Sequence, residues 1–256
     1  MSTTYGPGRF ESIVDRSITE IKSNVKTVGQ YAFYGCTKLT SAEFPNATSI
    51  GQYAFYGCSK LESAEFPNTT SIGEYAFYGC TALENMDFLN VTTISGWSFM
   101  NCKAIKSVHF PRAKLVGYGF SSCTSLQNAV IGNLNGESGS FDGCSNLTTV
   151  DIVISGRTGV NAFNNCSALI SIIIRPNAVQ ELRNISAFTG TPFASGGTGG
   201  TIYIPKALYD HLGDGTSSDY KAAANWSTID GYGTITWAQI EGSQYENYYA
   251  DRTLIE

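Results

Sequence analysis

The sequence predicts a right-handed α/β solenoid, with a parallel β-sheet on the concave side and short helical turns on the convex side. Three observations predict it: a recurring cysteine, a phenylalanine three residues before each cysteine, and an alternating apolar segment after it. The seven cysteines are 21 or 22 residues apart, at positions 36, 58, 80, 102, 123, 144 and 166. A fixed period of this length is typical of solenoids, in which each repeat forms one coil.

The phenylalanines predict the core. They are Phe33, Phe55, Phe77, Phe99, Phe120, Phe141 and Phe163, and Phe188 continues the series. A side chain that recurs once per coil stacks on its equivalents along the solenoid axis. We therefore expect a buried spine of rings, each contributing roughly 1.5–3 kcal/mol.

The segment after each cysteine predicts one short strand per coil. It reads L-x-x-φ-x-φ, where φ is apolar, as in Leu61, Ala64 and Phe66. Alternation with a period of two indicates a strand with one face inward, and strands of successive coils then pair about 4.8 Å apart. The residue before the cysteine is usually glycine, as at Gly35 and Gly57, which suits a left-handed residue that ends a one-turn helix.

The unit IGEYAFYGCTALENMDF resembles the BspA-like (treponemal-type) leucine-rich repeat, whose pattern is I-G-x-x-A-F-x-x-C-x-x-L-x-x-I-x-I-P. The resemblance extends from about Val28 to Arg175. It implies a leucine-rich repeat superhelix. Proteins that resemble this family are usually bacterial or protist surface or secreted proteins that bind other macromolecules, so the resemblance implies such a role here.

The ends of the chain depart from the repeat. We expect an N-terminal capping coil over residues 1–27, leucine-rich repeats over 28–204 and a C-terminal cap over 205–256, because exposed coil ends require caps. Within the last part, we expect strands at Ile202–Ile204 and Thr234–Trp237, and helices at Ala207–Leu212 and Asp219–Trp226.

Composition excludes several partners. A net charge of −5 provides no basic field for nucleic acid. The strongest apolar stretch, Leu169 to Ile174, is far shorter than the roughly 20 residues that a bilayer span requires, so we expect no membrane insertion. The first residues have neither the basic nor the apolar region of a secretory signal, and a chain whose signal had been removed would look the same.

The cysteines predict a reduced structural ladder. Parallel stacking points their Cβ vectors the same way, which is poor disulfide geometry, and no Cys/His spacing indicates a metal site. The two histidines, His109 and His211, belong to no catalytic constellation, and metalloprotease, Walker and dinucleotide motifs are absent from the sequence. We therefore expect no enzyme activity, no catalytic residues, no bound metal and no cofactor.

Outward residues of the predicted strands form the first candidate binding surface. One row contains Glu43, Glu65, Asp87, His109, Val130, Asp151 and Ile173, and its neighbour contains Ser41, Ser63, Asn85, Ser107 and Asn128. Carboxylates in register about 4.8 Å apart repel by about 1 kcal/mol per neighbour in water. The candidate contact residues are Ser41, Glu43, Glu65, Asn85, Asp87, His109, Asn128 and Asp151. The alternative is a solvated acidic face partly neutralised by Lys38 and Lys60.

Aromatic residues form the second candidate surface. One row is Tyr31, Tyr53, Tyr75, Trp97 and Tyr118, and beside it are Tyr34, Tyr56, Tyr78 and Met100. Tyrosine and tryptophan are enriched in interfaces, and stacked aromatic rings could hold a sugar. The alternative is packing between turns of the convex side.

These observations favour a non-enzymatic recognition scaffold that binds a protein or a surface glycan. The family resemblance implies a bacterial adhesion or interaction protein, extracellular or on the cell surface. The competing hypothesis is a structural or receptor-binding protein of a phage or prophage tail, which would be virion-associated or cytoplasmic.

Overall fold

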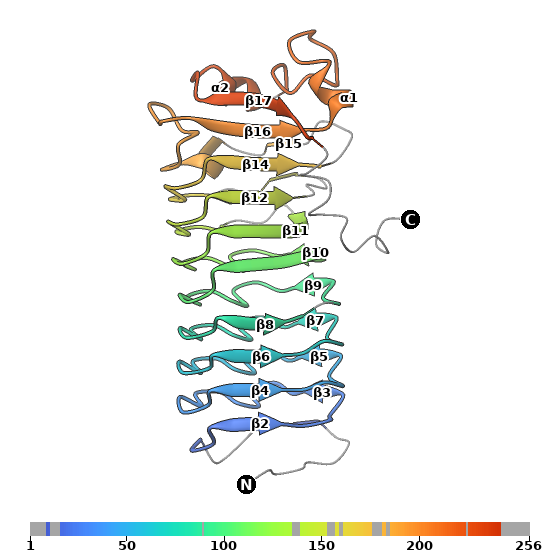
Figure 1. Ribbon diagram of the computed structural model, residues 1–256, viewed down its shortest axis with the longest axis vertical. Helices are drawn as coiled ribbons and strands as arrows, with labels where there is room; N and C mark the ends of the chain where they lie inside the picture. The colour runs from blue at the N-terminus through green and yellow to red at the C-terminus, as the bar shows by residue number, and fades with distance from the viewer. Residues whose placement is uncertain are drawn as a thin grey trace.

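The predicted parallel β-solenoid is confirmed. A computed structural model of the chain describes residues 9–10, 16–88, 90–134, 139–152, 157–158, 161–175, 181–182, 185–223 and 225–241. Successive coils lie on one another in an elongated column, and their strands cross the column in parallel (Figure 1).

The strands form two stacks in the N-terminal half. The first stack is a four-stranded sheet of β2 (Glu20–Lys22), β4 (Ser41–Glu43), β6 (Ser63–Glu65) and β8 (Asn85–Asp87). The second stack contains β1 (Arg9–Phe10), β3 (Thr27–Val28), β5 (Ser49–Ile50), β7 (Ser71–Ile72) and β9 (Thr93–Ile94). Figure 1 shows the two stacks side by side in the lower half of the column.

The second stack continues into longer strands and becomes an 11-stranded sheet. Its further members are β10 (Ser107–Leu115), β11 (Asn128–Leu134), β12 (Thr149–Ile152), β14 (Ser171–Ile174), β16 (Gly200–Ile204) and β17 (Ile235–Gln239). The short strands β13 (Arg157–Thr158) and β15 (Glu181–Leu182) pair separately.

A proline–asparagine turn separates the two strands of the early coils. In the coil of β4, Ala47 N–H donates to the Phe44 carbonyl at 3.1 Å, which closes a turn with Pro45 at its second position. The Asn68 side-chain amide donates to the Pro45 carbonyl of the preceding coil at 2.7 Å. At the equivalent position of β10 the asparagine is replaced by Arg112, and the strand continues from Ser107 to Leu115.

The predicted phenylalanine spine is confirmed. The rings of Phe33, Phe55, Phe77, Phe99 and Phe120 stack with centroids 4.9–5.2 Å apart, and the column continues through Phe141 and Phe163 to Phe188 at 5.6–5.8 Å. All eight are buried. A second column, Phe44, Phe66 and Phe88, contacts the spine edge-on. The two columns together fill the interior of the N-terminal coils.

The side opposite the strands consists of turns, where one-turn helices were expected. Cys36 N–H donates to the Phe33 carbonyl within its own coil at 3.1 Å, whereas Phe33 and Gly35 N–H donate to carbonyls of the next coil at 2.6 and 2.7 Å. Gly35 has the expected left-handed conformation, with φ of 67°. Because alternate N–H groups point along the solenoid axis, they bond to the next coil and cannot continue a helix.

The C-terminal region covers the end of the spine. It contains η1 (Ile185–Phe188), α1 (Lys206–Tyr209) and α2 (Trp226–Asp230), and the buried Trp226 contacts Phe188 with ring centroids 6.0 Å apart. The strands predicted at Ile202–Ile204 and Thr234–Trp237 are confirmed as β16 and β17. The two strands pair in parallel.

The prediction of a helix at Asp219–Trp226 is wrong. The Asp219 carboxylate accepts hydrogen bonds from the backbone N–H groups of Gly215 at 3.0 Å and Lys221 at 2.8 Å. It therefore fixes a turn and does not cap a helix, and α2 begins only at Trp226. The division at residues 27 and 204 remains a prediction.

Candidate functional site

The first strand stack places the N-terminal part of the acidic row in register. Backbone pairing aligns Lys22 with Glu43, Glu43 with Glu65, and Glu65 with Asp87. The middle residue of each of β2, β4 and β6 is buried, so the flanking residues point outward. We call Lys22, Glu43, Glu65, Asp87, His109, Val130, Asp151 and Ile173 the strand row.

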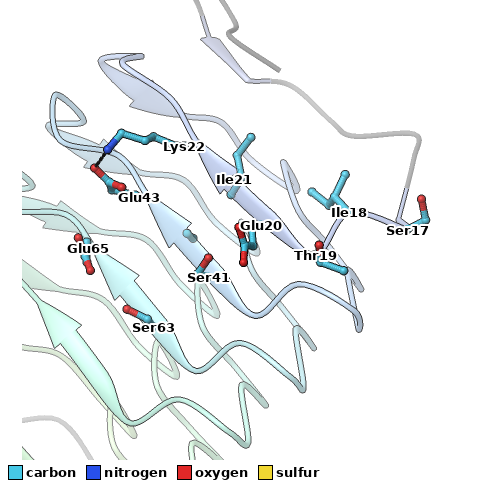
Figure 2. Close-up of a pocket in the computed structure, with 11 residues that line it drawn as sticks. Ser17, Ile18, Thr19, Glu20, Ile21, Lys22, Ser41, Glu43, Ser63 and Glu65 are labelled. Atoms are coloured by element: carbon cyan, nitrogen blue, oxygen red, sulfur yellow. Dashed lines mark ion pairs between the residues drawn. The ribbon is translucent and has the colours of Figure 1, made fainter. Parts of the chain in front are cut away.

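A depression lies over β2, β4 and β6 at the N-terminal end of this face. Its volume is about 570 Å³. It is lined by hydroxyl, carboxylate, ammonium and small apolar groups, from Ser17, Ile18, Thr19, Glu20, Ile21, Lys22, Ser41, Ala42, Glu43, Ser63 and Glu65. Figure 2 shows Ser41, Ser63, Glu20 and Glu65 along this surface. The depression thus joins three coils into one polar surface.

Lys22 neutralises part of this surface. Its ammonium forms an ion pair with the Glu43 carboxylate (Figure 2). Within the described ranges, Glu20 and Glu65 form no ion pair, and neither do Lys38 and Lys60, which were expected to neutralise the row. Lys22 and Glu20 were not among the residues predicted from the sequence. Their spacing of 21 residues from Glu43 and Ser41 was the available signal.

Asp151 is not part of an exposed surface, and its place among the candidate contact residues is wrong. Its residue is 6% exposed, and both carboxylate oxygens pair with the Arg175 guanidinium, with Nε to Oδ1 at 2.6 Å. Burial raises the pKa of the Asp151 carboxyl, against the opposing effect of Arg175. Arg175 directly follows β14, so the end of one strand covers the outward residue of another.

The other residues of the C-terminal part do not form a continuous acidic row. His109 and Asn128 are exposed on β10 and β11, but the pairing partner of His109 is the half-buried Val130, and Ile173 is buried. The side chains of Asn85 and Asp87 lie outside the described part of the structure. Among the described side chains, the carboxylates that lie over neighbouring strands are Glu20, Glu43 and Glu65.

The aromatic rows form two stacked ladders. In the first aromatic ladder, Tyr31, Tyr53, Tyr75, Trp97 and Tyr118, ring centroids are 4.8–5.7 Å apart and planes differ by 2–10°. In the second aromatic ladder, Tyr34, Tyr56 and Tyr78, the distances are 4.8–5.0 Å. The ladders also contact each other, as between Tyr31 and Tyr34 at 5.8 Å. The packing interpretation is therefore correct for the ring faces, which neighbouring rings cover.

The ladders nevertheless remain partly accessible. Tyr31 is 44% exposed and Tyr34 is 38% exposed, whereas the other rings are half-buried. Burial raises the pKa of Tyr53, and the nearby carboxylate of Glu74 contributes to the rise. The Tyr53 hydroxyl therefore stays protonated at neutral pH and can donate a hydrogen bond.

The backbone of the first aromatic ladder is left-handed. Tyr31, Tyr53, Tyr75 and Trp97 have φ of 56–57°, a conformation that costs a residue with a side chain about 1–2 kcal/mol. The same column continues with Gly139 at 70° and Asn161 at 60°, the residue types that adopt it most readily. A stacked aromatic pair contributes about 0.5–1.5 kcal/mol. Stacking on two neighbours therefore offsets the strain of an interior ring, and Gly139 and Asn161 show that the coil also accepts non-aromatic residues at this position.

The cysteine ladder is structural. None of the seven cysteines, all of which the structure describes, forms a disulfide, and all are buried. Cys58, Cys80 and Cys102 donate through Sγ to the carbonyls of Phe33, Phe55 and Phe77 in the preceding coil at 3.0–3.2 Å, and Cys123, Cys144 and Cys166 do the same. Burial raises the pKa of Cys144 to about 12, so this thiol is not an available nucleophile or metal ligand.

The described residues contain no group of three or more His, Cys, Asp or Glu side chains that could hold a metal ion. His211 pairs with Asp214 through Nδ1 at 2.7 Å on an exposed loop, away from the strand row. In the same described ranges, every helix is too short to cross a membrane. The surfaces above therefore remain the principal candidates.

A family comparison determines the identity of the repeats. The model of the BspA type leucine-rich repeat region matches residues 3–127 and 113–195 with six copies. This protein belongs to the BspA type leucine-rich repeat family. No curated protein matches the sequence.

Solved structures that are similar to this chain include the following bacterial proteins. The Treponema pallidum leucine-rich repeat protein is 24% identical, with 57% of this chain and 72% of that chain covered and a TM-score of 0.47. The pneumococcal vaccine antigen PcpA is 16% identical, with 80% and 66% covered and a TM-score of 0.44. A Faecalibacterium prausnitzii leucine-rich cell surface protein is 17% identical, with 95% and 91% covered and a TM-score of 0.30.

Proposed function

We propose that this protein is a non-enzymatic recognition scaffold, exposed on or secreted from a bacterial cell, that binds a protein partner through the depression at its N-terminal end. Membership in the BspA type family supports the scaffold role. A rigid stack of parallel strands presents side chains of three coils at fixed spacing, which suits an extended contact with another macromolecule.

The observation that carries the proposal is the set of carboxylates over β2, β4 and β6. Glu20 and Glu65 are exposed without an ion pair among the described residues, while Lys22 satisfies only Glu43. Their excess negative charge is complementary to a partner segment that carries lysine or arginine. The hydroxyls of Ser41 and Ser63 between them add hydrogen-bonding groups.

Charge reversal tests this proposal. An octalysine peptide serves as the probe, and its affinity is measured for the unmodified protein, for Glu20→Lys with Glu65→Lys, and for Glu74→Lys with Glu62→Lys. The two double variants carry the same net charge, but only the first alters the depression. We expect the first to weaken binding at least about ten-fold more than the second, since contact charges act at short range. Equal losses in the two variants would contradict a site in the depression.

Location and adhesion are tested on cells. Antibody labelling of intact producing bacteria should detect the protein, and a deletion strain should lose attachment to its natural surface. Labelling only after lysis would contradict a surface role. The alternative of a phage or prophage tail protein stays a prediction.

A further inference from the structure

The two aromatic ladders form a long, narrow strip outside the proposed protein-binding depression. The strip is two rings wide and follows the solenoid axis from Tyr31 to Tyr118, with successive rings 4.8–5.7 Å apart. A stable contact with a globular partner covers about 800 Å² on each side, which calls for a broader surface. A strip of this shape instead suits a linear chain that lies along the axis.

The repeat of the strip selects the kind of linear chain. The rings of Tyr31, Tyr53, Tyr75 and Trp97 recur every 4.8–5.1 Å. An extended polypeptide advances about 3.2–3.4 Å per residue, so its side chains would fall out of register within two coils. One sugar of an extended β-1,4-linked chain has about the length of this spacing, whereas an α-1,4-linked chain coils and does not keep the register.

The chemistry of the strip fits an uncharged, hydroxyl-rich ligand. Tyr31, Tyr53 and Tyr75 of the first aromatic ladder each follow a residue of an amide ladder that ends in a carboxylate. In it, Gln30 donates to Gln52 at 3.1 Å and Gln52 donates to Glu74 at 3.0 Å. Tyrosine hydroxyls and side-chain amides both donate and accept hydrogen bonds. No lysine or arginine belongs to these ladders. The Arg16 guanidinium lies beside Gly35 at the N-terminal end of the strip, so an anionic polymer finds no row of counter-charges along the ladders.

The strip is also ordered before any ligand arrives. Stacking fixes the rings, and the Gln30–Gln52–Glu74 chain of hydrogen bonds fixes the amides. A surface with immobile side chains loses little entropy on binding. In addition, Gly139 and Asn161 hold the same left-handed position without an aromatic ring, which shows that the backbone alone does not demand Tyr53 or Tyr75.

We propose that the first aromatic ladder and the adjacent amide ladder bind an extended, uncharged β-1,4-linked glycan, one sugar per coil, through tyrosine hydroxyls, ring edges and amides. The ring faces are covered by neighbouring rings, so the ligand contacts the outer edges of the ladder. This site uses no residue of the depression over β2, β4 and β6.

Calorimetric titration with oligosaccharides of defined length tests the proposal. The probes are cellohexaose and chitohexaose, their shorter homologues, and maltohexaose as the α-linked control. We expect at least one β-linked series to bind with an affinity that rises with each added sugar up to about the number of coils in the ladder, and maltohexaose to bind at least ten-fold more weakly. Absence of binding by both β-linked hexasaccharides, or equal binding of maltohexaose, would overturn the proposal.

A double variant locates the site. Tyr53→Asn with Tyr75→Asn removes two central rings and introduces the residue that Asn161 shows to be compatible with this backbone. We expect it to lower the affinity for the bound hexasaccharide at least ten-fold, whereas Glu65→Lys in the depression leaves this affinity unchanged. Unchanged glycan binding in the double variant would overturn the assignment to the ladder, whatever the outcome for the depression.

Light scattering over a range of protein concentrations tests whether a second copy of the chain, and not a glycan, covers the strip. We expect the mass of the monomer at every concentration. A dimer that forms in the unmodified protein and is lost in the double variant would assign the strip to a second copy of the chain and overturn the glycan proposal.

Discussion

The N-terminal and C-terminal halves share one core but carry different surfaces. Phe77 and Phe141 are equally buried in the same spine. Above this spine, the N-terminal half presents Tyr75 and exposed carboxylates, while the C-terminal half has Gly139 in the aromatic column and a buried Asp151 in the strand row. The comparison shows that the stacked interior determines the coil, and that surface columns can change without altering it.

The largest expected effect tests whether the core is common to both halves. Phe77→Ala and Phe141→Ala should each lower the free energy of unfolding by about 3–5 kcal/mol, because each opens a cavity inside a stacked column. Urea denaturation of the two variants measures it, with Thr81→Ala as an exposed control. A loss below about 1 kcal/mol in either half would contradict a continuous spine.

The two ion pairs of the strand row should differ in the same assay. Arg175→Ala leaves the buried Asp151 carboxylate without its counter-charge and should cost about 3 kcal/mol, because both side chains are only 7–8% exposed. Lys22→Ala breaks a pair whose side chains are 67% and 36% exposed, and should cost less than about 1 kcal/mol. Equal costs would mean that Asp151 is solvated, and would contradict its burial beneath Arg175.

The cysteine ladder gives a prediction about reactivity. Because burial raises the pKa of Cys144 to about 12 and all seven thiols are buried, the folded protein should react slowly with a thiol reagent at pH 8. In denaturant, seven thiols should titrate. Rapid reaction of several thiols in the folded protein, or fewer than six after unfolding, would contradict a reduced ladder inside the coil.

Periodicity predicted most of the interior, because a repeat fixes which residues lie over one another. It predicted the spine from Phe33 to Phe188 and the thiol ladder. It did not predict the pairing of Asp151 with Arg175, since register gives the direction of a side chain but not what covers it. The turn at Asp219 was mistaken for a helix start because an aspartate caps either structure, and only the carboxylate contacts distinguish them.

The candidate surfaces were predicted less completely than the core. The row of Glu43 and Glu65 and the aromatic rows followed from spacing alone. Lys22 was missed because the first coil lacks the phenylalanine and cysteine that define the frame. The left-handed backbone of Tyr53 was also missed, although Gly139 and Asn161 in the same column carry the signal.

Substitution of neighbouring positions in one coil tests most directly whether the aromatic ladder is a surface feature on an independent core. Tyr75→Asn and Phe77→Ala are compared by urea denaturation. The first should lower the free energy of unfolding by less than about 2 kcal/mol, because relief of the left-handed strain offsets part of the lost stacking on Tyr53 and Trp97, while the second should cost about 3–5 kcal/mol. A loss for Tyr75→Asn as large as that for Phe77→Ala would show that the ladder belongs to the structural core, and would contradict its role as a recognition surface.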